Sequence, residues 1–304
     1  MSNRIRIGSR QSPLALKQAR IVADRLIAQS PDWDCEIVPI ETQGDVDKIT
    51  PLALMGGKGV FVKALEVALL EQAIDIGVHS LKDFTSALTP GLTLSSFLEA
   101  ETIADVMILK KPAVGLDLSD LPKGLCIGTS SLRRKALLKY LRPDFKCIDI
   151  RGNIGTRIEK LHGDEMDGII LSHAGLIRMG IANENLLVLP EKSFFPAPGQ
   201  GVIALQIREN DNVSETLSRS INNEPQEALS RVELALLADL GFDCNAPFGV
   251  FTQIENNMCR INAFVASPDL TEFVFKEHHY NRVQTPNGWA ELGTSLKEVI
   301  NRWV

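Results

Sequence analysis

Hydroxyl and guanidinium side chains gather at two points where an expected strand runs into an expected helix. The stretch "IGTSSLRR" carries Thr129, Ser130, Ser131, Arg133 and Arg134, and the stretch "IRGNIGTR" carries Arg151, Asn153, Thr156 and Arg157. A helix N-terminus offers unpaired N–H groups and a partial positive charge, and arginine forks match carboxylates. Two such turns favour an anion pocket, although the first turn taken alone is better explained as a capped helix with solvated arginines. The two stretches lack the Gly-rich spacing of a phosphate loop, so a carboxylate is the better match for this pocket. The sequence alone leaves a phosphate ligand open.

Polar groups also follow two strands expected nearer the N-terminus. "IGSRQS" places Arg10 and Ser12 after the first strand, and "VHSLKD" places Lys82 and Asp83 after the third. A lone carboxylate among cationic groups can stabilise a cationic intermediate or pass a proton. The simpler interpretation of Asp83 is an ordinary aspartate at the end of a strand.

Cys244 lies in a turn, "LGFDCNAPFG", rather than among apolar neighbours in a strand or helix. A cysteine that only packs belongs in such apolar surroundings, so this thiol is a candidate to hold a ligand. The five cysteines are odd in number and widely spaced, and they form no CxxC pair. We therefore expect neither a disulfide framework nor a metal site, and the pattern fits a reducing compartment.

The composition and charge of the chain limit the kinds of ligand and compartment that we expect for it. The 304 residues are 23% charged with a net charge of −6, but residues 121–160 hold ten Lys/Arg against three Asp/Glu. A basic block in an acidic chain favours a local anionic ligand over a bound nucleic acid, with a solvated helix face as the alternative. No apolar run approaches the ~20 residues of a membrane span, and the N-terminus has no signal-peptide core. We expect a cytoplasmic protein without a membrane partner.

Strands and amphipathic helices alternate along most of the chain. A β-α-β-α-β order over residues 4–80 predicts an α/β unit, and a second such unit begins near residue 105. From about residue 222 a helix, three alternating strands and a closing helix predict a small α+β domain. The predicted domains are 1–99 with 200–218, 100–199, and 219–304. Ligands of such sheets usually bind beyond the carboxyl ends of the strands, so all the polar turns are expected to face one crevice.

Several long motifs occur in one order along the chain. They are "GSRQSPLALKQA", "GGKGVFVKALEVALL", "DIGVHSLKD", "GTSSLRR", "RGNIGTRIEKL", "AGLIRMG", "PAPGQG" and "DCNAPFG". In this order they resemble the porphobilinogen deaminase (hydroxymethylbilane synthase) family, from residue 4 to the Cys244 turn and more weakly beyond.

The resemblance implies a fold and a reaction. The fold is two domains similar to type II periplasmic binding proteins plus a small α+β C-terminal domain that presents the cysteine. In the family the turn cysteine carries a dipyrromethane cofactor through a thioether bond. Four porphobilinogen molecules are added to it head to tail, each with loss of ammonia, and hydrolysis releases hydroxymethylbilane. We also expect a monomer.

The resemblance also assigns roles to residues of this chain. Asp83 matches the catalytic aspartate, and Cys244 the cofactor attachment site. The residues implied in cofactor binding are Lys82, Asp83, Ser130, Ser131, Arg133, Arg134, Arg151 and Cys244. Those implied in substrate binding are Arg10, Ser12, Arg151, Arg157, Arg178 and Gln200.

Some positions depart from the family pattern. Phe84-Thr85 stands where Val-Pro is common after the catalytic aspartate, and Phe242-Asp243 replaces two glycines before Cys244. The usual "DPRDA" is "TIADVM" at 102–107, and Leu234 and Asp239 stand where arginines are common. A slow or non-catalytic paralogue that binds a carboxylate-bearing small molecule is therefore the alternative function.

Overall fold

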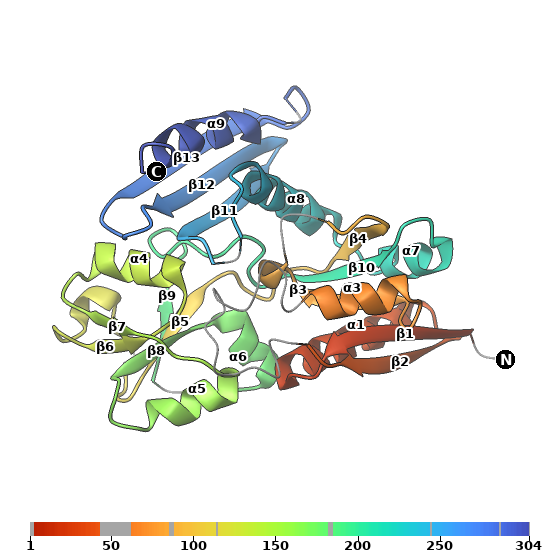
Figure 1. Ribbon diagram of the computed structural model, residues 1–304, viewed down its shortest axis with the longest axis horizontal. Coiled ribbons are helices and arrows are strands. Elements are labelled where there is room, and N and C mark those ends of the chain that lie inside the picture. The colour runs from red at the N-terminus through yellow and green to blue at the C-terminus, as the bar shows by residue number, and fades with distance from the viewer. Residues whose placement is uncertain are drawn as a thin grey trace. The chain divides into compact units, whose positions relative to one another are not determined.

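The computed structural model describes residues 3–42, 62–84, 88–113, 115–181, 185–243, 245–285 and 287–303. The chain divides into two compact units, Met1–Glu101 with Gly201–Ser230 and Thr102–Gln200 with Arg231–Val304 (Figure 1).

The first unit contains a five-stranded mixed sheet in the order β2-β1-β3-β10-β4. Its strands are β1 (Asn3–Arg10), β2 (Trp33–Ile40), β3 (Ile76–Ser80), β4 (Leu92–Phe97) and β10 (Ile203–Arg208). β1 is parallel to β2 and β3, whereas β10 is antiparallel to both of its neighbours. The carboxyl ends of β1 and β3 therefore lie at one edge of the sheet.

Helices cover both faces of this sheet. Helix α1 (Pro13–Gln29) and helix α7 (Asn212–Arg219) bury their apolar residues in one core with β1, β3 and β10. Helix α3 (Lys63–Leu70) packs in a second cluster with Ile74, Leu92 and the alternate residues of β2. The predicted cap of α1 is confirmed, because the Ser12 side chain accepts from Ala15 N and Pro13 occupies the first turn.

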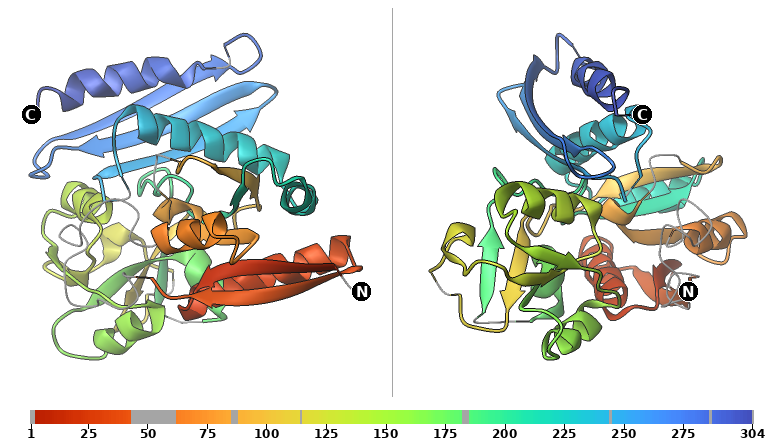
Figure 2. Two further views of the ribbon diagram at one scale, coloured as in Figure 1. Left: turned by 45° about the vertical axis from the view of Figure 1, so that its right-hand side comes forward. Right: turned by 60° about the vertical axis from the view of Figure 1, so that its left-hand side comes forward.

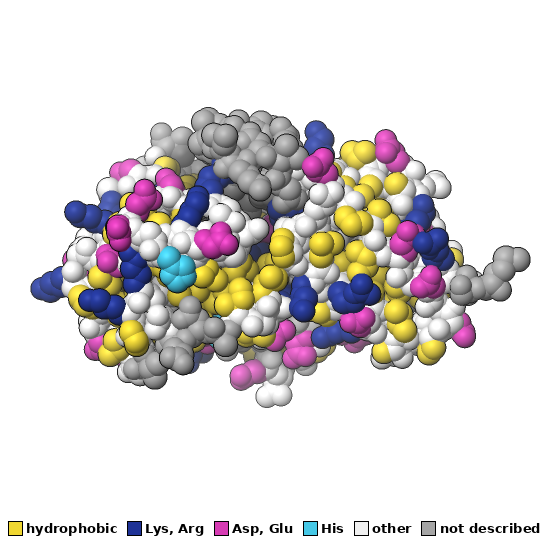
Figure 3. Space-filling model, turned by 90° about the horizontal axis from the view of Figure 1, so that it is seen from below, with side chains coloured by type: hydrophobic (Ala, Val, Ile, Leu, Met, Phe, Trp, Pro, Cys, Tyr) yellow, Lys and Arg dark blue, Asp and Glu magenta, His cyan; other side chains and the backbone are white. Residues whose placement is uncertain are grey.

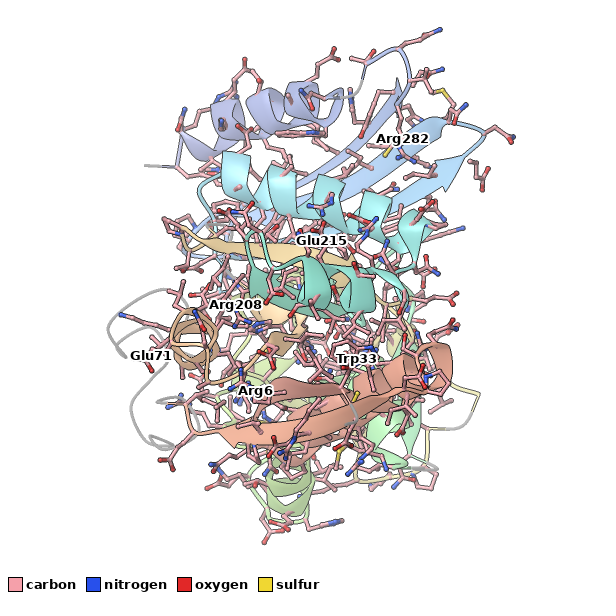
Figure 4. All side chains as sticks on the ribbon, turned by 90° about the vertical axis from the view of Figure 1, so that its right-hand side faces the viewer. Arg6, Trp33, Glu71, Arg208, Glu215 and Arg282 are labelled. Carbon is pink, nitrogen blue, oxygen red and sulfur yellow. The ribbon has the colours of Figure 1, made fainter. Side chains whose placement is uncertain are left out.

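A partly buried ion cluster stabilises the edge of this sheet opposite the carboxyl ends of β1 and β3. Arg6 and Arg208 both bind Oδ1 of Asp75, at 2.7 and 3.2 Å, and Arg208 also binds Asp211 at 2.6 Å. Figure 4 shows Arg6 and Arg208 on neighbouring parts of the sheet. Burial would raise the pKa of Asp75, but the hydrogen bonds from Arg6 and Arg208 outweigh it and hold that pKa low.

The second unit contains another five-stranded mixed sheet, in the order β7-β6-β8-β5-β9. Its strands are β5 (Asp105–Leu109), β6 (Cys126–Gly128), β7 (Lys146–Ile148), β8 (Gly168–Ser172) and β9 (Leu186–Leu189). β6 is parallel to β7 and β8, and β5 is antiparallel to β8 and β9. The two sheets share one topology. The first three strands in each order are parallel, and the fourth is antiparallel to both of its neighbours.

Helices again lie on both faces of this second sheet. Helix α4 (Leu132–Leu141) packs on one face, and helices α5 (Ile154–Leu161) and α6 (His173–Met179) pack on the other. The repeated sheet order with helices on both faces confirms the predicted α/β fold of these two regions.

A three-stranded antiparallel sheet completes the second unit. It consists of β11 (Phe248–Glu255), β12 (Met258–Ala266) and β13 (Phe273–Asn281). Helices α8 (Glu224–Asp239) and α9 (Trp289–Ile300) bury apolar residues against one face, and Figure 2 shows both helices on that side. The other face contributes Phe251 and Phe264 to the core that contains α4. The predicted α+β character of this region is confirmed, while the three predicted domain boundaries stay a prediction.

Four elements of the structure lie outside the strands and helices expected from the sequence. They are the strands β4, β5 and β9 and the helix α7. β5 matters most for the site, because its first residue is Asp105.

Candidate functional site

The first unit holds a small polar cavity where β1 and β3 end. The cavity has a volume of about 60 Å³, and it is lined by Arg10, Ser12, Leu14, Ala15, Gln18, Val62, Val78, His79, Ser80 and Asp83. Asp83 lies in a short 3-10 turn, Leu81–Asp83, that directly follows β3. The structure therefore brings the predicted residues Arg10, Ser12 and Asp83 together at one cavity.

Two polar side chains of this cavity bind each other. Gln18 Nε2 donates to Ser80 Oγ at 2.9 Å, and Ser80 Oγ donates to Gln18 Oε1 at 3.0 Å. This pair ties α1 to the end of β3. The hydroxyl of Ser12 caps α1, so Ser12 has a structural role besides its predicted contact with substrate.

His79 is the buried wall of the same cavity. It is 5% exposed, and its Nε2 lies 3.0 Å from Oε1 of Gln206 on β10. Desolvation, with a smaller contribution from Arg10, lowers the pKa of His79 to about 4. The imidazole is therefore neutral at physiological pH.

The second unit contains a buried cluster built on Asp105. Arg133 donates to Oδ2 of Asp105 at 2.7 Å, and Arg134 donates to Oδ1 at 2.7 Å. Asp105 is 0% exposed, and the two arginines are 3% and 6% exposed. Burial would raise the pKa of Asp105, but the attraction of the two guanidiniums holds it well below its ordinary value.

Backbone carbonyls and one amide complete the hydrogen bonding of the cluster. Arg133 also donates to the carbonyl of Phe195, and Arg134 to that of Ile170 at 2.9 Å. Gln200 donates to Asp105 Oδ1 at 3.1 Å and accepts from Arg133 at 3.4 Å. Two guanidiniums share one carboxylate, so the cluster keeps an excess positive charge.

The excess charge is relevant to an anionic ligand. A buried cation without full compensation is costly, and a bound carboxylate would offset that cost. Nε of Arg134 is also buried, with no hydrogen-bond acceptor among the described residues. The turn that carries Arg133 and Arg134, here called the arginine turn, can therefore bind an anion in addition to its protein partners.

Ser130 and Ser131 both organise this turn. Ser130 Oγ donates to the Ile150 carbonyl at 2.9 Å and accepts from Ile150 N at 3.0 Å, which joins the two predicted anion turns. Ser131 is the N-cap of α4 and accepts from Arg134 N. The two turns are therefore neighbours, as expected from the parallel pairing of β6 and β7.

The other predicted binding residues occupy the same part of the second unit. Arg151 and Arg157 are half-buried around the start of α5, where Arg157 Nε donates to the Gly152 carbonyl at 2.8 Å. Arg178 is buried in α6, which directly follows β8. The predicted crevice that all these residues share with Asp83 stays a prediction, and Cys244 lies outside the described residues.

Two residues of these sites were missed from the sequence. Asp105 was noticed only within a stretch that lacks the family's proline and arginine, and Gln206 was not singled out. Because Asp105 is the one acid retained within "TIADVM", its position at the start of an apolar run was an available signal.

Comparison with known proteins decides the family. The model of "Porphobilinogen deaminase, dipyromethane cofactor binding domain" matches residues 5–216, and that of "Porphobilinogen deaminase, C-terminal domain" matches residues 228–301. The chain belongs to the porphobilinogen deaminase family. A curated porphobilinogen deaminase from Desulforamulus reducens is 40% identical over 300 residues, which cover 99% of this chain and 95% of that protein.

Similar solved structures share little sequence identity with this chain. The periplasmic VFT2 domain of BvgS from Bordetella pertussis is 14% identical with a TM-score of 0.41, over 77% of this chain and 90% of that one. The probable amino-acid ABC transporter extracellular-binding protein ytmK from Bacillus subtilis is 12% identical with a TM-score of 0.41, over 78% and 97%.

The structure accounts for several departures from the porphobilinogen deaminase pattern. Phe84 is buried, and its ring meets that of His79 edge-on at 5.2 Å. Phe242 packs against Phe248 at 5.7 Å, and Asp243 accepts from Asn245 N at 2.9 Å. These three residues pack or stabilise a turn.

None of the described helices has the length and apolarity that crossing a bilayer requires. No group of His, Cys, Asp or Glu among the described residues is arranged to hold a metal ion.

Proposed function

We propose that this chain is a hydroxymethylbilane synthase that joins four porphobilinogen molecules head to tail, with loss of ammonia, on a dipyrromethane carried by Cys244. The proposed activity rests on membership of the family and on 40% identity to a curated porphobilinogen deaminase over nearly the whole chain. No observation favours the non-catalytic paralogue, because the departures nearest the site have packing roles.

The arginine turn fits the acidic side chains of a dipyrromethane. The excess positive charge of the Asp105 cluster and the unused Nε of Arg134 are suited to its carboxylates. In this proposal Arg133, Arg134 and Arg151, with Lys82, Ser130 and Ser131, bind the group and orient it. When bound, it supplies the pyrrole carbon to which the first substrate is joined. Each charge-assisted hydrogen bond contributes about 1.5–3 kcal/mol.

Asp83 is proposed as the catalytic group. Loss of ammonia and ring-to-ring bond formation both develop positive charge on substrate pyrroles, and a fixed carboxylate in a partly dry cavity stabilises that charge. Arg10, Ser12, Arg151, Arg157, Arg178 and Gln200 are proposed to bind substrate carboxylates. Of these, Gln200 is already engaged by Asp105 and Arg133, so its contact would be shared.

We propose a cytoplasmic monomer that acts on a small molecule and has neither nucleic-acid nor membrane partners. On the face drawn in Figure 3, the described basic and acidic side chains are interspersed, which does not suit a polyanion.

An intact mass spectrum tests the proposal. The chain purified from a host that makes porphobilinogen should exceed its sequence mass by two porphobilinogen units less two ammonias. Cys244→Ser should remove the increment, whereas the matched control Cys35→Ser, which changes a half-buried thiol on β2, should keep it. An unmodified wild-type mass together with no bilane formed from added porphobilinogen would overturn the proposal.

A further inference from the structure

A chain of buried hydrogen bonds runs behind the Asp83 cavity. Thr89 Oγ1 donates to Glu66 Oε2 at 2.8 Å, and Gln206 Nε2 donates to Glu66 Oε1 at 3.0 Å. Gln206 Oε1 then lies 3.0 Å from His79 Nε2. The side chains of Glu66, His79 and Gln206 are all buried, at 8%, 5% and 0% exposure.

The carboxylate at the start of this chain sets its direction. An ionised carboxylate only accepts hydrogen bonds, so the Gln206 atom that faces Glu66 must be the amide NH₂. The carbonyl oxygen of Gln206 therefore faces His79, and His79 Nε2 must be the donor. A neutral imidazole carries one proton, so Nδ1 is left with a lone pair.

Nothing in the described structure uses that lone pair. No described residue forms a hydrogen bond with Nδ1. His79 also lines the cavity with Arg10, Gln18, Ser80 and Asp83. The charged groups around the ring are Arg10, Asp83 and, beyond Gln206, Glu66. Burial and Arg10 both disfavour a proton on the ring, since each lowers its pKa.

We propose that His79 is a specificity-determining acceptor, whose proton is fixed on Nε2 by Gln206 and Glu66 and whose Nδ1 accepts a hydrogen bond from an N–H group of the substrate. This inference rests on the proposed function, because porphobilinogen brings a pyrrole N–H and an aminomethyl ammonium to the cavity. Asp83 then stabilises the positive charge of the substrate, while His79 accepts a hydrogen bond from the substrate N–H and keeps its own protonation state.

Nitrogen-15 NMR of the wild-type imidazoles tests the tautomer without any variant or turnover. Between pH 5.5 and 8 the His79 resonances should show a protonated Nε2 and an unprotonated Nδ1, with no titration near the ordinary value of about 6.5. The assignment follows from their loss in His79→Asn. A proton on Nδ1, or a titration near that ordinary value, would overturn the inference.

Two substitutions separate recognition from structural support. The amide of Asn lies near the position of Nδ1, and the longer amide of Gln lies near that of Nε2. His79→Gln should keep the bond to Gln206 but raise KM by roughly three- to tenfold, the effect of one neutral hydrogen bond. His79→Asn should lose the bond to Gln206 yet keep a KM closer to wild type, with the melting temperature lowered more.

A merely structural role predicts the same order in stability but the opposite order in KM, with the KM of His79→Gln closer to wild type than that of His79→Asn. That order of KM values would overturn the inference. Glu66→Gln provides a further test. A neutral amide at this position can donate as well as accept, so it no longer fixes the direction of the hydrogen-bond chain. The NMR should then show both tautomers of His79. A wild-type protein that forms no bilane would overturn the proposed function instead, and the tautomer measurement would still stand.

Discussion

The guanidinium of Arg133 binds Oδ2 of Asp105 at 2.7 Å, and both side chains are buried. Because Arg134 binds the other oxygen of Asp105, loss of this charge leaves two buried cations side by side. Asp105→Asn is expected to lower the free energy of unfolding by about 3–5 kcal/mol, measured from urea denaturation.

The control for this prediction is Glu36→Gln. It removes an exposed ion pair with Arg4 at 2.8 Å, so the free energy should change by less than about 1 kcal/mol. Equal small losses in the two variants would show that the buried cluster adds little to stability.

Arg133 and Arg151 should separate stability from cofactor loading. Arg133→Leu breaks the Asp105 cluster, so it should lower the melting temperature and also reduce the fraction of chain that carries the mass increment. Arg151 is only half-buried, and Arg151→Leu should reduce loading while the melting temperature stays within a few degrees of wild type. Arg151→Lys should restore loading in part, because a point charge cannot bind a carboxylate bidentately.

Intact mass and thermal unfolding, measured on the same preparations, test the pair. Full loading of Arg151→Leu would remove Arg151 from the proposed site.

Local signals made part of the site predictable. Ser12 before Pro13 predicted the start of α1, and "GTSSLRR" predicted a strand that runs into a capped helix, because caps and strand ends depend on neighbours in sequence. The parallel order of the strands then predicted that Arg10 and Asp83 would share an edge. Each of these inferences required only the chain order and the known geometry of parallel strands.

Contacts between distant segments were not predictable in the same way. β5 is a five-residue strand whose last four residues are apolar, and periodicity cannot distinguish so short an apolar run from a buried helix segment. Without β5, nothing in the sequence shows that Asp105 meets Arg133, which lies 28 residues away. The choice between anion-binding and solvated cations in the basic block likewise depended on burial: Arg133 is buried, whereas Lys135 pairs with the exposed Asp149.

Glu233 should make stability depend on pH. Its carboxyl on α8 accepts from Gly199 N at 2.8 Å and from Thr252 Oγ1 at 2.9 Å, yet desolvation raises its pKa to about 7. The unfolded chain loses this proton near pH 4.5 and the folded chain only near pH 7, so folding is progressively disfavoured as the pH rises between these values. Glu233→Gln cannot lose the proton, and its melting temperature relative to wild type should rise from pH 5 to pH 7.

Thermal unfolding of both proteins across that range measures the difference. A constant offset between the two curves would mean that Glu233 titrates normally in the folded protein.

Asp83 is expected to affect the chemistry of the reaction rather than the binding of the cofactor. It lines the cavity at the end of β3 with Arg10 and the neutral His79, so its carboxylate is the anionic group of that lining. Asp83→Asn keeps shape and polarity but removes the charge, and turnover of porphobilinogen should fall on the order of 10²-fold or more. The mass increment on the chain should remain, and Asp83→Glu should retain more activity because its charge survives at a shifted position. Turnover and intact mass are measured on the same preparations, with Asp117→Asn, a change in the exposed turn before residues 118–120, as the matched control. Near-normal turnover by a loaded Asp83→Asn variant would show that the positive charge on the pyrroles is stabilised elsewhere.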